Sequence, residues 1–211
     1  MEISAKLVKE LRDRTGAGMM ECKAALKEAN GDLAAAEIVL RKRGITSASK
    51  KSARATRQGI IGTYVHPGSQ LGVLVEVNCE SDFVARTDQF QNLVKDIAMQ
   101  IAAADPQFIR KEDVTPDALE KERDIQKDRA RQEGKPEKML DKIIEGRMQK
   151  FYEEICLYEQ PFIKDNTQTV TDLIKSNIAK MGENISVSRF VRFKVGDAAV
   201  IEETPETGVP A

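Results

Sequence analysis

The sequence is short of the residues on which most enzyme active sites are built. It contains no tryptophan and a single histidine among 211 residues. That histidine, His66, precedes Pro67-Gly68, a pair typical of a surface turn, whereas acid–base and nucleophilic catalysis need a base poised beside its reaction partner. The G-x-S-x-G motif and the Walker lysine motif are absent as well. We therefore expect neither covalent catalysis nor catalytic residues.

Cysteine is scarce, and its spacing does not fit the common metal and redox motifs. Cys22, Cys79 and Cys156 are the three cysteines, and they stand far apart and never in the C-x-x-C arrangement. A single histidine cannot form an imidazole cluster. We predict buried, reduced thiols, no metal site and no cofactor.

Neither a strong net charge nor a long apolar run is present. The chain has 33 basic and 34 acidic residues, which gives a formal net charge of -1. A nucleic acid or an anionic membrane would therefore have to bind a local patch. No stretch approaches the roughly 20 apolar residues that span a bilayer, and the start, Met1-Glu2-Ile3-Ser4, is unlike a secretion signal. We expect a cytoplasmic protein with no membrane partner.

Residues 1–44 have the pattern of three short helices. Ser4 is placed to cap the first helix, which we expect to end at Gly16 because glycine accepts the left-handed conformation. Asp32 is placed to cap the third helix, which we expect to end at Gly44. Apolar residues recur at helical spacing in each segment, so we predict a three-helix bundle. The second helix shows this best, in Cys22, Ala25, Leu26 and Ala29.

A basic stretch follows the predicted bundle. Residues 41–57 hold seven basic residues and no acidic residue. We predict a basic linker over residues 45–57. The alternative is a surface for phosphate groups, in a ribosome- or nucleic-acid-associated protein. Because the stretch lacks aromatic residues for base stacking, we favour the linker and expect no direct contact with nucleic acid.

Residues 58–196 change to a mixed pattern, which predicts an α+β core domain. Two strand-like runs, 58–66 and 71–79, flank Pro67-Gly68-Ser69 and predict a hairpin. The apolar face of residues 88–103 predicts a helix. Residues 110–150 predict two solvated helices. We expect the second to face the core through Met139, Ile143, Met148 and Phe151.

The last part of this domain predicts one more helix and one more strand. Thr169 is placed to cap a helix that stops at Gly182. Residues 185–195 alternate, and we expect Ile185, Val187, Val191, Phe193 and Val195 to share one face. The fold class is therefore α+β, an antiparallel sheet of three strands covered by helices, after the N-terminal bundle. The acidic tail, residues 197–211, predicts disorder.

Two apolar sites do not fit these helix faces. Met19 and Met20 are adjacent, so both cannot point inwards, and methionine adapts well to a partner surface. Phe83 lies at the start of the 88–103 helix, out of phase with its apolar stripe, beside Ser81 and Asp82, either of which could cap that helix. Insertion of Phe83 into a partner and packing in the core both remain open.

Four segments resemble the elongation factor Ts family. Residues 11–23 (LRDRTGAGMMECK) resemble its N-terminal signature, and residues 75–85 (VEVNCESDFVA) resemble its core signature. The resemblance continues through 159–163 (EQPFI) and 182–185 (GENI). Longer members carry two related core subdomains and an inserted helical hairpin. This chain has room for one core, as the short members do.

The resemblance implies a guanine-nucleotide exchange factor for elongation factor Tu. It implies that a UBA-like bundle binds the nucleotide domain of that GTPase through Arg12, Met19, Met20 and Lys23. Asp82 and Phe83, flanked by Ser81 and Val84, would insert between two helices of the GTPase and disturb its Mg²⁺ and phosphate site. It also implies a homodimer, in which two chains supply the two cores.

Two other classes of function remain open beside the exchange factor. One is the ribosome- or nucleic-acid-associated protein that would use the basic residues between 41 and 57. The other is an adaptor that would use the bundle, residues 1–44, for another partner.

Overall fold

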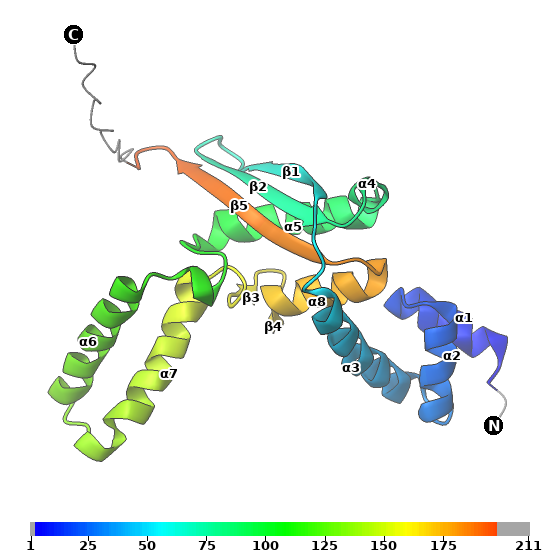
Figure 1. Cartoon of the computed structure of the whole chain (residues 1–211), viewed down its shortest axis with the longest axis horizontal. Helices are drawn as coiled ribbons and strands as arrows, with labels where there is room; N and C mark the ends of the chain where they lie inside the picture. The colour runs from blue at the N-terminus through cyan, green and yellow to red at the C-terminus, as the bar shows by residue number, and fades with distance from the viewer. Residues whose placement is uncertain (1–2, 198–211) are drawn as a thin grey trace, which may run out of the picture.

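The computed structural model describes residues 3–197, and these residues form a mixed helix and sheet fold (Figure 1). A bundle of α1, α2 and α3 lies at one end, and a hairpin of α6 and α7 lies at the other. The antiparallel sheet, in the order β1-β2-β5, lies between them with its helices. The predicted α+β class is therefore confirmed. Apart from Asp197, the predicted acidic tail falls outside the described residues.

The N-terminal bundle forms around the predicted apolar stripes. Ser4 Oγ accepts the backbone N–H of Leu7, and Gly16 ends the first helix in the left-handed conformation, as the sequence indicated. Asp32 caps the third helix by accepting the N–H of Ala35. The bounds are α1 Ala5–Thr15, α2 Met19–Glu28 and α3 Leu33–Lys51. The buried residues of the bundle are Ile3, Val8, Leu11, Cys22, Ala25, Leu26 and Ala36.

The third helix does not end at Gly44, and this prediction was wrong. The helix continues to Lys51, so most of the predicted linker is helical and only residues 52–57 connect it to the sheet. Gly44 lies where α3 packs on α8 (Val170–Met181). A Cβ at Gly44 would lie 3.1 Å from the Cβ of Ala179. The glycine therefore permits a close approach of two helices rather than a helix end.

The sheet buries one face against helices. Strands β1 (Gln58–Val65) and β2 (Leu71–Cys79) form the predicted hairpin, and β5 (Ile185–Lys194) pairs antiparallel with β2. Helix α5 (Asp88–Ala104) packs on β1 and β2. Side chains of β2 that share the inner face are buried as predicted, namely Val73, Val75, Val77 and Cys79.

The prediction of a single apolar face along residues 185–195 was wrong. A β-bulge separates Glu76, which pairs with Arg189, from Val77, which pairs with Val187. The extra residue reverses the side on which later side chains point. Val187 is therefore buried, whereas Phe193 is 65% exposed on the outer face.

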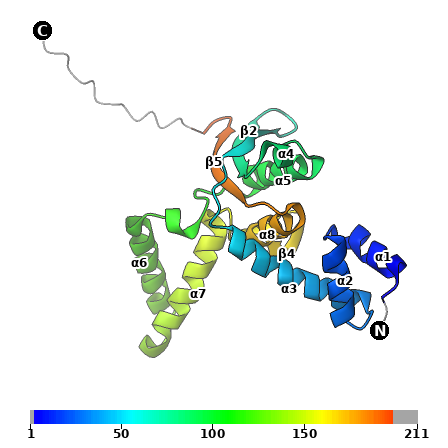
Figure 2. The same ribbon diagram turned by 45° about the vertical axis from the view of Figure 1, so that its right-hand side comes forward.

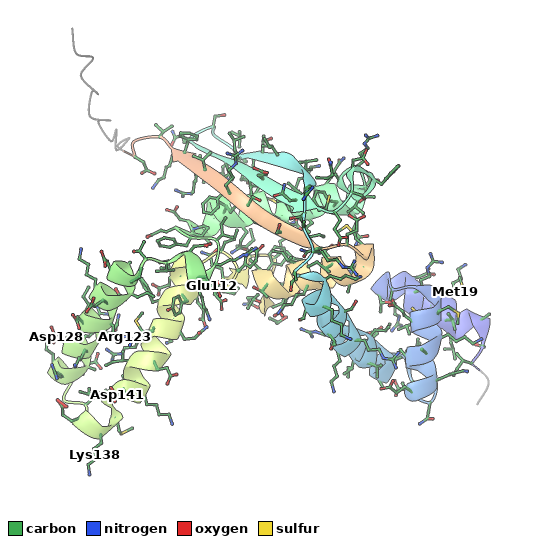
Figure 3. All side chains as sticks on the ribbon, in the orientation of Figure 1. Met19, Glu112, Arg123, Asp128, Lys138 and Asp141 are labelled. Carbon is green, nitrogen blue, oxygen red and sulfur yellow. The ribbon has the colours of Figure 1, made fainter. Side chains whose placement is uncertain are left out.

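The hairpin of α6 (Pro116–Gln132) and α7 (Glu137–Ile155) projects from the rest of the chain. The predicted inner face of the second helix was partly wrong, because Met139 is exposed whereas Met148 is buried. Charged side chains project from both helices, and Figure 3 labels Arg123, Asp128, Lys138 and Asp141. The buried side chains of α7 are Leu140, Ile144, Met148 and Ile155, and the first three pack with Ala130 of α6.

The correction to α7 has a simple geometric cause. The helix packs on its hairpin partner rather than on the sheet, and the row at 140, 144 and 148 repeats at i, i+4 and i+8. Helices α6 and α7 thus form a helical hairpin with its own apolar contact.

The remaining elements are short, apart from α8. Its predicted cap is present, because Thr169 Oγ1 accepts the N–H of Asp172 while Gly182 ends the helix in the left-handed conformation. The sequence analysis did not predict the two-stranded antiparallel sheet of β3 and β4. The bounds are α4 Asp82–Ala85, a 3₁₀ turn Lys111–Asp113, β3 Pro161–Phe162 and β4 Asp165–Thr169. Within residues 3–197, no helix combines the length and apolar character that crossing a membrane requires.

Gly62 tests how tightly α5 packs under the sheet. A Cβ at this position would lie 2.2 Å from Cγ1 of buried Val94, whose branched side chain has little freedom to move. We expect Gly62→Ala to lower the free energy of unfolding by about 1 to 3 kcal/mol, as measured from urea unfolding curves. Gly146→Ala on α7 is the control, because nothing lies within 4 Å of the added Cβ there. An equal effect of both substitutions would contradict this packing.

Candidate partner-binding surface

The short helix α4 forms a tip between β2 and α5. Ser81 is the N-cap of α4, and its Oγ accepts the N–H of Val84. The prediction that Ser81 or Asp82 caps the 88–103 helix was wrong, because Thr87 caps α5 by accepting the N–H of Phe90. Ala85 is buried and Val84 is partly buried, so this side of the helix is anchored in the core. The Phe83 side chain is 79% exposed. The sequence left the place of Phe83 open, and the structure excludes a core position.

Asp82 is held by a local ion pair. Its Oδ2 lies 2.7 Å from Nη2 of Arg86, one helical turn later. Both side chains are substantially exposed, at 47% for Asp82 and 78% for Arg86. An exposed pair of this kind contributes little stability, so Asp82 is available to exchange Arg86 for another partner at small cost.

The carboxylate of Glu183, about one hundred residues later in the sequence, binds the segment that leads into the tip. Glu183 Oε2 accepts the backbone N–H groups of Glu80 and Ser81, at 3.1 and 3.0 Å. Glu183 Oε1 accepts the Ser81 hydroxyl at 2.6 Å. The sequence analysis named Glu183 only as part of the family resemblance and did not place it at the site. The contact joins residues about one hundred positions apart, and no local pattern indicates it.

The bundle presents a second predicted surface, which we call the bundle patch: Arg12, Met19, Met20 and Lys23. Met19 is 58% exposed and Met20 is 75% exposed at the start of α2, where the sequence required only one to be exposed. Arg12 on α1 and Lys23 on α2 are also exposed. Figure 3 labels Met19 on this part of the bundle.

The tip and the bundle patch are separate surfaces at the same end of the molecule. In Figure 1 and in the turned view of Figure 2, α4 lies on the side of the sheet that is nearer the bundle, and the hairpin extends on the opposite side. The segment after α3 joins the bundle to the first strand of the sheet. The bundle, which carries the bundle patch, is therefore joined through residues 52–57 to the sheet, beside which the tip lies.

The thiols are unsuited to chemistry at either surface. Cys22, Cys79 and Cys156 are buried and free, as predicted. Burial raises the pKa of each thiol, because a thiolate is poorly solvated inside a protein. For Cys156, burial and the nearby Glu159 carboxylate raise the pKa to about 11. Near neutral pH these groups are protonated and weakly nucleophilic.

The other groups considered from the sequence do not form a catalytic constellation. His66 is an exposed turn residue, as expected, and its Nδ1 lies 3.1 Å from the hydroxyl of Tyr64. Within residues 3–197, no cluster of His, Cys, Asp or Glu has the arrangement of a metal site. A cavity of about 350 Å³ lies where the bundle meets α8 and β4. Its charged lining mixes both signs: Glu21, Glu37, Arg41, Arg43, Lys51, Asp165, Asp172 and Lys180.

Comparisons with known proteins agree on one family. The family described as Elongation factor TS matches residues 38–197. The chain is 73% identical to Elongation factor Ts of Solibacter usitatus over 206 residues, which cover 98% of this chain and 97% of that relative. It is 61% identical to Elongation factor Ts of Koribacter versatilis, over 93% of this chain and 90% of that protein. It is 60% identical to Elongation factor Ts of Thermosipho melanesiensis over 195 residues, which cover 92% of this chain and 100% of that protein.

The exposure of Phe83 gives a direct stability test. We expect Phe83→Ala to change the free energy of unfolding by less than about 1 kcal/mol, because the ring makes little contact with the core. Phe90→Ala is the matched control, since Phe90 on α5 is 0% exposed. Loss of that buried ring costs about 3 to 5 kcal/mol. Urea unfolding of both variants decides the matter, and similar losses in the two would place Phe83 in the core.

Proposed function

The chain belongs to the elongation factor Ts family, and we propose from this that it releases GDP from elongation factor Tu by inserting the tip of α4 beside the nucleotide. Family membership makes the chain a nucleotide exchange factor in translation elongation. The observation that supports insertion is the Phe83 ring, 79% exposed on an anchored helical turn. Asp82 and Phe83, flanked by Ser81 and Val84, form the inserting element.

Insertion accounts for exchange without a covalent step. By thermodynamic linkage, a factor that binds the empty GTPase more tightly than the GDP-bound form must weaken GDP binding by the same ratio. A thousandfold effect requires about 4 kcal/mol of differential binding, which a buried aromatic anchor and a disturbed Mg²⁺ ligand together supply. The proposed target of the tip is therefore the Mg²⁺ and phosphate site of the GTPase.

The bundle patch supplies a second contact with the nucleotide domain. Met19 and Met20 present flexible apolar side chains that adapt to a partner, and Arg12 and Lys23 provide flanking charge. Because the bundle and α4 lie at the same end of the molecule (Figure 2), we propose that one partner domain contacts both the bundle patch and the tip. We assign docking to the bundle and displacement of GDP to the tip.

The outer face of the sheet supports a homodimer. The bulge in β5 places apolar side chains on this face, and the strand register sets Leu74 beside Val191 and Gly72 beside Phe193. The exposed apolar residues there are Ile61, Val65, Leu74, Val191 and Phe193. A contiguous patch of this kind is rare on a monomer. We assign it to a second copy of the chain, paired by a two-fold axis and without a covalent link.

Direct binding to nucleic acid is not part of this proposal. Two of the seven basic side chains between residues 41 and 57 are engaged in ion pairs, Arg43 with Glu28 and Arg54 with Glu80. The other five lie on α3 or in the segment that follows it, namely Arg41, Lys42, Lys50, Lys51 and Arg57. A cytoplasmic location follows from the proposed partner, since elongation factor Tu acts in translation.

Loss of the Phe83 ring should impair exchange. We expect Phe83→Ala to lower the accelerated release of a fluorescent GDP analogue from elongation factor Tu at least about tenfold, or roughly 1.4 kcal/mol of transition-state stabilisation. Asp82→Ala should also slow release while the protein stays folded. Met139→Ala is the control, because Met139 is an exposed apolar residue on the distant hairpin. If Phe83→Ala released GDP at the wild-type rate, insertion of the Phe83 ring would be ruled out.

The homodimer is tested by placing a charge on the outer sheet face. We expect Phe193→Asp to give a monomer of 23.5 kDa in sedimentation velocity, whereas the wild-type chain sediments as a dimer at micromolar concentration. Met139→Asp should leave the dimer intact. Reductant should have no effect, because all three cysteines are free and buried. A wild-type chain that sediments as a monomer would refute the pairing.

A further inference from the structure

The tip needs support beyond its own hydrogen bonds. Helix α4 has four residues, a single turn, and an isolated turn is unstable because its nucleation cost exceeds the gain from one or two hydrogen bonds. Its most exposed residue is the one proposed to enter the partner. The orientation of Phe83 therefore depends on groups outside α4.

Glu183 supplies this support through both of its carboxylate oxygens. Three hydrogen bonds reach it from two adjacent residues, namely the N–H groups of Glu80 and Ser81 and the Ser81 hydroxyl. Hydrogen bonds to a charged acceptor are stronger than neutral ones. The site is partly buried, so the carboxylate is only partly screened by water.

The Ser81 hydroxyl links Glu183 to α4, because it hydrogen-bonds both the Glu183 carboxylate and the Val84 N–H. Because it donates its proton to Glu183 Oε1, its lone pairs are free to face the N–H of Val84, which it caps at 3.4 Å. A hydroxyl without a fixed acceptor could rotate away from the cap. Glu183 thus fixes the cap, the cap fixes the first turn of α4, and that turn carries Phe83.

The residue after Glu183 connects the tip to the bundle. The Asn184 side chain donates to the backbone carbonyls of Ser52 and Arg54, at 3.2 and 2.7 Å, just after the end of α3. The Asn184 N–H also donates to Glu80 Oε1 at 2.7 Å. The turn after α8 thus holds both the segment before the tip and the segment that leaves the bundle.

We propose that Glu183 is a positioning residue for nucleotide exchange, one that fixes the tip relative to the bundle patch without touching the partner. This inference rests on the proposed insertion of the tip. It assigns Glu183 a role separate from its effect on stability. A group that serves only stability, once the protein is folded, leaves the exchange rate unchanged.

The test separates docking from displacement of GDP. Glu183→Gln keeps the shape of the side chain but removes its charge and turns an amide towards the N–H donors. We expect a maximal rate of GDP release about tenfold lower, with the concentration of factor at half-maximal rate changed less than about twofold, because the bundle patch still docks. The control is Glu133→Gln, since the Glu133 carboxylate also accepts a hydrogen bond, in this case from Arg147, but on the distant hairpin.

A double-mutant cycle tests whether Glu183 acts through the ring. Added to Phe83→Ala, Glu183→Gln should cause much less than a further tenfold loss of rate, because the ring that it positions is already gone and only Asp82 of the inserting pair remains. A full additional tenfold loss would overturn the proposal, as would a wild-type maximal rate for Glu183→Gln alone. Should Glu183→Gln fail to fold, Ser81→Ala replaces it, because this change removes the hydroxyl between Glu183 and Val84 and leaves the backbone contacts.

A fluorescence measurement tests the position of the tip without the partner. The chain has no tryptophan, so Phe83→Trp introduces a single indole at the tip. We expect Glu183→Gln in this background to lower the fluorescence anisotropy of the indole, and Glu133→Gln to leave it unchanged. Unchanged anisotropy with Glu183→Gln overturns the inference even if Phe83 proves essential. If Phe83→Ala exchanges at the wild-type rate while Glu183→Gln still lowers the anisotropy of the indole, the proposed insertion of Phe83 fails. The support of the tip by Glu183 then stands.

Discussion

A sheet has two faces, and among residues 3–197 helices cover only one face of the β1-β2-β5 sheet. Helix α5 closes over the inner face, where Gly62 leaves room for Val94, and this packing fixes the ends of β2 and α5. The tip spans the gap between those two ends, so its place is determined by the core. The same one-sided covering leaves an apolar outer face. The proposed partner surface and the proposed dimer surface are thus two consequences of a single layer of packing.

Local patterns predicted those parts of the fold that depend on residues close in sequence. The caps at Ser4, Asp32 and Thr169 and the helix ends at Gly16 and Gly182 involve groups within a few positions of each other. Their hydrogen bonds form in the same way whatever surrounds them. The two long strands of the hairpin were predicted for the same reason, because a short turn between alternating runs brings them together.

The errors arose where a distant element decides the outcome. Gly44 resembles a helix end, but its role is set by Ala179 on another helix. The bulge beside Glu76 arises between strands more than a hundred residues apart, and alternation along β5 alone does not indicate it. Met139 fits a helical stripe, but the buried row of α7 is the one that packs against α6, namely Leu140, Ile144 and Met148. Periodicity gives the spacing of a face, but only tertiary packing selects which face is used.

The candidate site was predictable to the same extent. Phe83 was singled out because it is out of phase with its neighbours, which is a local property, whereas Glu183 was missed because its contacts are not local. An exposed phenylalanine ring adds little to the stability of its own chain, and its affinity for a partner is reduced by the cost of fixing a mobile segment. Hydrogen bonds that hold the turn before binding remove part of that cost. An exposed ring therefore needs a rigid support. If the turn that carries Phe83 were mobile, part of the binding free energy would be lost in ordering the turn and would not contribute to exchange.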